Sequence, residues 1–329
     1  MSKGFSLIIY TLLLFLLIFS SCERNDYELF DPDTAGTWTL YTTKDGLPSN
    51  SAGDISLDRK GNLWVSFPGY GIAKYDYQSW HVYRSTTSPL INDIVNCLTV
   101  SADGNIIFGT LDGVSVLSAE GVWTSYVDPV NTMDVTAVKV AKNGWIWIGT
   151  RDKGFYVNTG TGYTNNIIAG YERVRAIEEG TSGAIYIGTE NGLVKWQNNV
   201  YSYIKKTDGL PDDLITSLKF DSKQRLWVGT EAGKNVVWFD TGGTLHKVNL
   251  MTGSDSVRIR DIFEDRRGHI WFATSRNGLI KYDGVVPRSF REYNGFPENS
   301  VTCIGEDKFG NLWIGLKSKG LVKYVLPIE

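Results

Sequence analysis

Two arginine pairs have the clearest capacity for binding chemistry in this sequence. Arg173 and Arg175 stand two residues apart, and Arg258 and Arg260 repeat the same spacing. Residues two apart on a β-strand project from the same face, and a guanidinium group can clamp a carboxylate or sulfate group bidentately. The pairs therefore predict a site for an anionic ligand, provided that both lie on strands that reach one common surface.

Further polar residues could complete this site. When the strands are aligned as described below, the candidates are Asn96, Asp134 and Thr216 on strands, and Arg151 and Arg276, with Lys234 and Lys317, in turns. Two interpretations remain open. Either the cations receive an acidic or sulfated glycan fragment or an acidic peptide, or Asp212, Asp213, Asp255 and Asp261 pair with the arginines and leave a neutral surface.

The sequence offers no catalytic constellation near these arginines. His81 and His246 are expected on outermost strands, and His269 in a turn at the opposite face. None is therefore placed to act as a general base. No nucleotide-binding loop or paired metal-ligand motif appears. We expect no catalytic residue, no metal and no cofactor.

The element that positions these residues is a repeat. Seven segments share one pattern: Gly61 to Ser66, Gly104 to Gly109, Gly144 to Gly149, Gly183 to Gly188, Gln224 to Gly229, Gly268 to Ala273 and Gly310 to Gly315. Successive copies are about 40 residues apart, and each unit divides into four short β-runs separated by turns. This period predicts an all-β, seven-bladed β-propeller with four antiparallel strands per blade.

The two ends of the repeat complete one another. Residues 37 to 43 form an outermost strand with no blade before it, and residues 320 to 324 form a third strand with no partner after it. We expect them to pair, so that the first and last segments share the closing blade and leave no long sheet edge unpaired.

Aligning the inner strands places two polar and variable rings at the channel mouth. The first ring is Ser51, Ile94, Asp134, Arg173, Leu214, Arg258 and Ser300, and the second is Gly53, Asn96, Thr136, Arg175, Thr216, Arg260 and Thr302. The position between them is apolar, as Val95 and Val135 illustrate. Cys97 and Cys303 share one inner-strand position in blades separated by a third, which is too far for a disulfide. We expect them to be buried fillers.

The recurring aromatic and acidic residues are assigned to the scaffold. Trp64, Trp147, Trp227, Trp271 and Trp313 occupy one position of the second strand. Packing between neighbouring blades requires a large flat side chain there, so we expect a structural role in place of carbohydrate stacking. The carboxylates of Asp58, Asp265 and Asp307 are expected to bond turn amides.

These units resemble a known repeat. The segments Asp45-Gly46-Leu47-Pro48-Ser49-Asn50-Ser51 and Asp58-x-x-Gly61-Asn62-Leu63-Trp64 are similar to the two-component regulator propeller repeat, over residues 36 to 329. The resemblance implies a periplasmic ligand-binding sensor propeller of the hybrid two-component systems of Bacteroidetes. Because the sequence shows no kinase or DNA-binding segment, we expect a stand-alone binding propeller without phosphotransfer.

The first residues are typical of export. Lys3 precedes an apolar run from Phe5 to Phe19 that is shorter than the roughly 20 residues of a membrane span. We interpret residues 1–21 as a signal peptide. Its end, Phe19 to Cys22, resembles a lipoprotein cleavage box, which implies acylation of Cys22 and a lipid anchor; ordinary cleavage is the alternative. Residues 22–35 are expected to be an acidic tether, and residues 36–329 the propeller.

Composition and export together define the remaining functional classes. The formal net charge is −3, which argues against a nucleic-acid partner. We expect an outer-membrane lipoprotein of the bacterial cell envelope, periplasmic or surface-exposed, that contacts the membrane only through its anchor. Its partner is a small-molecule or glycan ligand or, if it is a scaffold, an envelope protein. A streptogramin-lyase-like enzyme is the third alternative.

Overall fold

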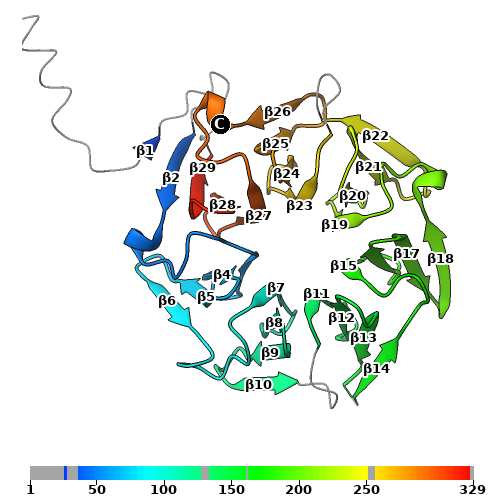
Figure 1. The fold of residues 1–329 in the computed structure, drawn as a ribbon, viewed down its shortest axis with the longest axis horizontal. Coiled ribbons are helices and arrows are strands. Elements are labelled where there is room, and N and C mark those ends of the chain that lie inside the picture. The colour runs from blue at the N-terminus through cyan, green and yellow to red at the C-terminus, as the bar shows by residue number, and fades with distance from the viewer. Residues whose placement is uncertain (1–25, 28–35, 127–132, 161, 251–255, 327–329) are drawn as a thin grey trace, which may run out of the picture.

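The chain folds into a ring of seven sheets around a central channel (Figure 1). The computed structural model describes residues 26–27, 36–126, 133–160, 162–250 and 256–326. The predicted signal peptide and Cys22 lie outside these residues, as does most of the tether. No described residue belongs to a helix with the length and hydrophobicity of a membrane span.

The first four blades follow one another in chain order, and each contains four antiparallel strands. Blade 1 contains β3 (Ile55–Leu57), β4 (Leu63–Phe67), β5 (Gly71–Tyr75) and β6 (Trp80–Tyr83). Blade 2 contains β7 (Val95–Val100), β8 (Ile106–Thr110), β9 (Gly113–Leu117) and β10 (Trp123–Tyr126). Blade 3 contains β11 (Val135–Val140), β12 (Ile146–Thr150), β13 (Phe155–Asn158) and β14 (Tyr163–Asn166). Blade 4 contains β15 (Val174–Glu179), β16 (Ile185–Thr189), β17 (Gly192–Gln197) and β18 (Val200–Ile204).

The last three blades complete the ring. Blade 5 contains β19 (Ile215–Phe220), β20 (Leu226–Thr230), β21 (Asn235–Phe239) and β22 (Leu245–Asn249). Blade 6 contains β23 (Ile259–Glu264), β24 (Ile270–Thr274), β25 (Leu279–Tyr282) and β26 (Pro287–Phe290). Blade 7 contains β27 (Val301–Glu306), β28 (Leu312–Leu316), β29 (Leu321–Val325) and β2 (Thr37–Tyr41). The predicted seven-bladed propeller is confirmed.

The closing blade joins the two ends of the repeat as predicted. β2 pairs antiparallel with β29 over five residues, from Thr37 opposite Val325 to Tyr41 opposite Leu321. Trp38 on β2 stacks on Tyr324 on β29 with 3.9 Å between ring centroids. β1 (Asp26–Tyr27) adds a short fifth strand beside β2. The segment expected to be an unpatterned tether therefore contains two residues that pair with the sheet.

Three 3-10 helices connect outer strands to the next inner strand. They are η1 (Thr43–Asp45), η2 (Lys206–Asp208) and η3 (Glu292–Asn294). Each ends at a glycine in the left-handed region, such as Gly46 with φ of 98°. Glycine adopts this conformation without steric cost, and the next residue, such as Leu47, is buried in the core. This geometry explains the Asp-Gly-Leu-Pro pattern in the sequence.

Buried carboxylates attach the recurring tryptophans to the turns. Asp307 is fully buried, and its Oδ2 accepts a hydrogen bond of 3.0 Å from Trp313 Nε1, while its Oδ1 accepts the backbone N–H groups of Phe309 and Asn311. The same indole-to-carboxylate bond joins Trp64 to Asp58, Trp227 to Asp221 and Trp271 to Asp265. The tryptophans and these turns are structural, as predicted, although the indole bond itself was not foreseen.

A glycine two residues after the recurring aromatic residue of the second strand, Tyr186 in blade 4 and Trp227 in blade 5, permits close contact between blades. A Cβ atom on Gly188 would lie 2.6 Å from Ile215 Cγ2, and one on Gly229 would lie 2.7 Å from Ile259 Cγ2. In each case the contacted side chain belongs to the inner strand of the next blade. In this recurring pattern the aromatic residue supplies a large side chain, and the glycine leaves space for a side chain of the next blade.

Removing one such carboxylate should destabilise the fold. In Asp307→Ala, the indole N–H of Trp313 and two turn amides lose their acceptor in a buried site, so we expect a loss of about 3 kcal/mol in the free energy of unfolding. Asp283→Ala is the matched control, because Asp283 bonds the turn amides of Val285 and Val286 near the surface. It should cost less than about 1 kcal/mol. Equal losses in denaturant titrations would contradict this role.

Candidate functional site

The inner strands begin on one face of the ring, and a β-bulge shapes the beginning of six of them, in blades 2 to 7. In blade 2, Val95 pairs with Thr110 and Cys97 with Gly109, so Asn96 is the extra residue. The same irregularity occurs at Thr136, Arg175, Thr216, Arg260 and Thr302. Bulges redirect side chains and are common near functional sites. The second predicted ring therefore has a local structural cause that the sequence alignment did not reveal.

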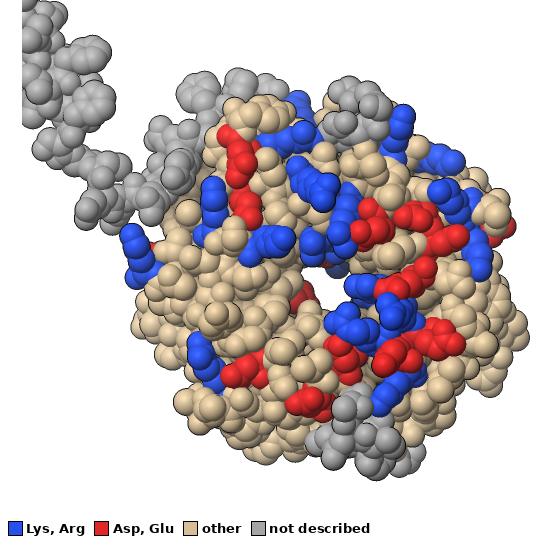
Figure 2. All heavy atoms as spheres, in the orientation of Figure 1, with Lys and Arg blue, Asp and Glu red and all other residues tan. Residues whose placement is uncertain are grey.

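These residues surround a cavity of about 480 Å³ at the channel mouth. All seven members of the second ring line it: Gly53, Asn96, Thr136, Arg175, Thr216, Arg260 and Thr302. Ser51 and Arg258 from the first ring also line it, with Arg151, Glu231 and Lys317 from turns. Figure 2 shows basic side chains gathered on one side of the channel opening, with acidic side chains between them.

The first arginine pair shares one carboxylate. Arg173 Nη1 lies 3.2 Å from Glu190 Oε2, and Arg175 Nε donates a 3.0 Å hydrogen bond to Glu190 Oε1. Partial burial opposes ionisation of Glu190, but the hydrogen bonds and charges of the two arginines outweigh it and lower the pKa of its carboxyl. The two guanidinium groups project together, as their spacing predicted.

The second pair is less neutralised. Arg258 Nε lies 2.7 Å from Glu231 Oε2, whereas Arg260 Nε donates to the hydroxyl of Ser275 at 2.8 Å. Desolvation, reinforced by the charge of Arg258, lowers the pKa of Arg260. Arg260 makes no ion pair with a carboxylate in the described part of the chain. Arg260 is exposed at the mouth, and Glu231 is a nearby opposite charge that forms no ion pair with it, so its guanidinium group can bind an anion.

The other candidates divide into two groups. Asp134 accepts from Asn96 Nδ2 at 3.0 Å and pairs with Arg151 Nε, so these three residues form one network. Thr216 lines the cavity, and its hydroxyl is buried without a hydrogen-bond partner among the described residues. Arg276 is exposed and does not contribute to the cavity wall.

The carboxylates that pair with the arginines differ from those suggested by the sequence. They are Glu190, Glu231 and Asp134, whereas Asp212 and Asp213 bond backbone amides. Asp255 lies outside the described residues. Glu190 and Glu231 occupy the turn position of Arg151, because each donates its backbone N–H to a first-ring carbonyl. Aligning the turns so that residues 151, 190 and 231 correspond could have identified these two glutamates from the sequence.

Two carboxylates lie deeper in the channel, in a cavity that continues from the mouth. Asp54 accepts the backbone N–H of Leu98 from the next blade, and Asp261 accepts that of Ile304. Burial raises the pKa of Asp54 to about 7, with a further contribution from Asp261, and burial raises that of Asp261 to about 6. The channel below the arginines therefore carries less negative charge than two ordinary carboxylates would.

The two cysteines share this deeper level of the channel. Cys97 and Cys303 are free thiols. Burial, with a smaller contribution from the charge of Asp54, raises the pKa of both. A thiol with a raised pKa is a poor nucleophile. Cys303 is buried, as predicted, whereas Cys97 is half-buried.

The raised pKa of Asp54 should produce a measurable pH dependence of stability. Because the folded state holds this proton more tightly than the unfolded chain, the stabilisation is present below about pH 4 and is lost as the pH rises through about 7. In Asp54→Asn this loss should be absent, apart from a constant cost for one weakened backbone hydrogen bond. Denaturant midpoints compared near pH 4.5 and pH 7.5 test this. Parallel pH profiles for the two proteins would refute it.

The histidines lie away from the channel mouth. His81 is on β6 and His246 on β22, both outermost strands, and His269 is in the turn before β24, where it contacts Asp265. No general base of this type therefore faces the arginines. The described residues contain no cluster of three His, Cys, Asp or Glu side chains suited to a metal ion.

Comparison with known proteins identifies the repeat. The family model described as two component regulator propeller matches residues 209–232, 253–276 and 295–317. The chain carries two-component regulator propeller repeats. Each match begins beside the outer-to-inner loop and extends through the first two strands of blade 5, 6 or 7. These are the segments that place second-ring residues at the mouth.

Three similar proteins set the context of these repeats. Histidine kinase P4 of Formosa agariphila is 26% identical over 256 residues, which cover 66% of this chain and 18% of the kinase. The extracellular domain of the putative hybrid two-component system BT3049 of B. thetaiotaomicron has a TM-score of 0.73 at 20% identity, covering 87% of this chain and 41% of that one. A streptogramin B lyase has a TM-score of 0.74 at 18% identity, covering 88% and 98%. The chain therefore spans less than half of either two-component relative, and the two structural likenesses establish the fold alone.

Proposed function

We propose that this chain is a binding propeller of the bacterial cell envelope, anchored through Cys22, that recognises an anionic glycan at its channel mouth. One observation carries the proposal. Six cations surround the mouth, namely Arg151, Arg173, Arg175, Arg258, Arg260 and Lys317, against the three carboxylates of Asp134, Glu190 and Glu231. The excess is concentrated at Arg260 and Lys317, which pair with no carboxylate among the described residues.

The chemistry of this rim favours sulfate or carboxylate groups on a hydroxylated ligand. Guanidinium groups bind both kinds of anion bidentately, and the hydroxyls of Thr136, Thr216 and Thr302 line the same cavity. The raised pKa values of Asp54 and Asp261 reduce repulsion of an anion that enters the channel. The repeats that match the two component regulator propeller model support a sensing role.

The proposal predicts that two arginines dominate binding. Calorimetric titration with a sulfated hexasaccharide should show saturable binding, and its desulfated counterpart should bind much more weakly. In Arg175→Ala/Arg260→Ala the affinity should fall by at least about a hundredfold, because each of the two lost charge-assisted hydrogen bonds contributes about 1.5–3 kcal/mol.

The matched control removes the same charge without altering the cavity wall. Lys234→Ala/Arg276→Ala changes two exposed cations outside the lining and should leave the affinity within about twofold. Equal losses of affinity in the two double variants would mean that the net charge of the protein, and not the position of the two arginines, causes the effect. An acidic peptide that binds in place of the hexasaccharide would reassign the ligand, and no binding of either anion would remove the proposal.

A further inference from the structure

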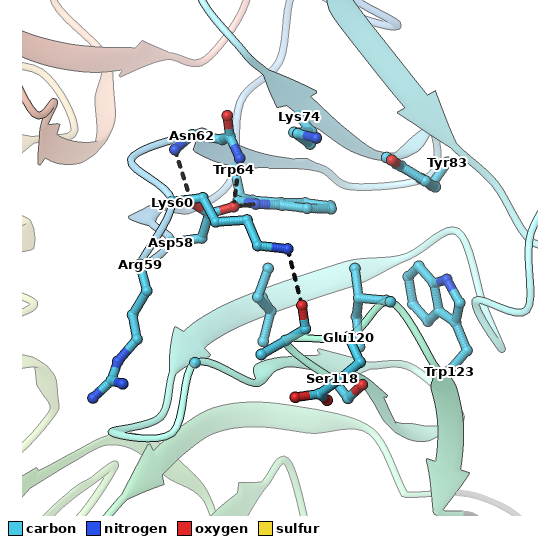
Figure 3. Close-up of a pocket in the computed structure, with 15 residues that line it drawn as sticks. Asp58, Arg59, Lys60, Asn62, Trp64, Lys74, Tyr83, Ser118, Glu120 and Trp123 are labelled. Carbon is cyan, nitrogen blue, oxygen red and sulfur yellow. Dashed lines mark hydrogen bonds between the residues drawn. The ribbon is translucent and has the colours of Figure 1, made fainter.

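A second cavity lies between blades 1 and 2, on the face remote from the channel mouth. It has a volume of about 270 Å³, and the turns at 58–62 and 118–121 form its rim. Figure 3 shows Trp64 and Tyr83 from blade 1 and Trp123 from blade 2 among the residues that line it. Trp64 is buried, and the other two are half-buried. We call this cavity the aromatic slot.

The internal repeats show which side chain the aromatic slot lacks. Leu117 on β9 pairs across the sheet with Trp123 on β10. At the same register, Tyr75 pairs with Trp80 in blade 1, and Tyr324 pairs with Trp38 in blade 7. The corresponding residues of blades 4, 5 and 6 are Trp196, Phe239 and Tyr282. Leucine therefore stands at a position that is aromatic in five of the other six blades.

In the neighbouring clefts a tyrosine ring fills this space. Tyr324 stacks on Trp38 at 3.9 Å between centroids, and its residual exposure is 1%. Tyr75 stacks on Trp80 at 4.6 Å, with the rings tilted by 22°. At the aromatic slot the buried ring of Phe108 stacks on Trp123 at 5.7 Å between centroids, and Leu117 stands at the position that a tyrosine occupies in blades 1 and 7. The scaffold thus contains two examples of the ring that this geometry accommodates.

Polar groups at the slot suit a ring that bears a hydroxyl. Lys74 lines it and forms no hydrogen bond or ion pair with the described residues. Lys60 Nζ crosses the rim and donates to the carbonyl oxygen of Ala119 at 2.9 Å. An ammonium group without a partner can donate to a phenolic oxygen, while the apolar walls contact the ring faces.

We propose that the aromatic slot binds a 4-hydroxyphenyl ring, supplied either by a free phenol or by a tyrosine side chain of a partner. The argument is independent of the anion site, because the slot lies at the opposite ends of the strands and shares no residue with the mouth. The aromatic and aliphatic side chains in its wall can contact a ring, and the polar side chains at its rim can bind the hydroxyl group.

Calorimetry with 4-methylphenol tests the proposal on the intact propeller. The wild-type protein should bind the probe saturably, and Leu117→Tyr should lose binding because the new side chain fills the slot as Tyr75 and Tyr324 fill theirs. Leu117→Phe provides a second variant with the same expected loss. N-acetyltyrosinamide distinguishes the sources. Binding of both probes supports a tyrosine from a partner, and binding of 4-methylphenol alone supports a free phenol.

Two controls locate the effect. Asn158→Tyr makes the equivalent change at the same register of blade 3, and Arg175→Ala/Arg260→Ala alters only the mouth. Both should retain 4-methylphenol binding. If wild-type protein does not bind the probe, or if both Leu117 variants bind it as wild type does, the proposal is overturned.

Discussion

The ring depends on the pairing of β2 with β29. A series of sheets that curves around an axis leaves a strand edge exposed unless its last blade is completed, and here the strand at 37–41 completes it. The stack of Trp38 on Tyr324, with Phe290 and Phe296 around it, adds a buried aromatic cluster at this seam. Because closure fixes seven inner strands around one axis, it also determines that their first residues meet at one mouth.

Within the closed ring, structural residues recur at equivalent positions of several blades, whereas the residues at the mouth vary. The buried apolar side chains form seven clusters between neighbouring blades. The Asp-to-Trp hydrogen bonds recur in four blades because each blade must solve the same packing problem. At the bulges no such requirement acts, so Asn96, Arg175 and Arg260 can differ. The basic side chains at the mouth therefore come from blades 3, 4, 6 and 7, and none that lines the cavity comes from blades 1 and 2.

Much of this architecture could be predicted from the sequence, because the spacing of the repeat determines the number and the order of the blades. Blade number, closure by the segment predicted at residues 37 to 43 and the buried tryptophans all follow from the spacing of similar segments. The bulges could not be predicted, because a regular strand and a bulged strand can have the same alternation of residues. Glu190 and Glu231 were missed as partners because they lie in turns, where register depends on a backbone hydrogen bond. Acylation of Cys22 stays a prediction.

The aromatic slot could not be predicted from the residue pattern of a single strand. Leu117 looks ordinary in an apolar strand, and its meaning emerges only when the cross-strand register places it beside Trp123, as Tyr75 lies beside Trp80. Likewise, Asp54 and Asp261 are unremarkable in the sequence. Both line the cavity below the arginines, and for Asp261 the bulge in β23 contributes to this position. In both cases the site depends on the register of the strands as well as on the type of residue.

Hydrogen–deuterium exchange at the seam tests the closed ring most directly. The account predicts that the amides of residues 37–41 exchange slowly and in step with those of residues 321–325, because the two strands share one ladder. Exchange of residues 37–41 at the rate of an unstructured peptide, while residues 321–325 and the inner strands remain protected, would contradict closure and with it the common mouth.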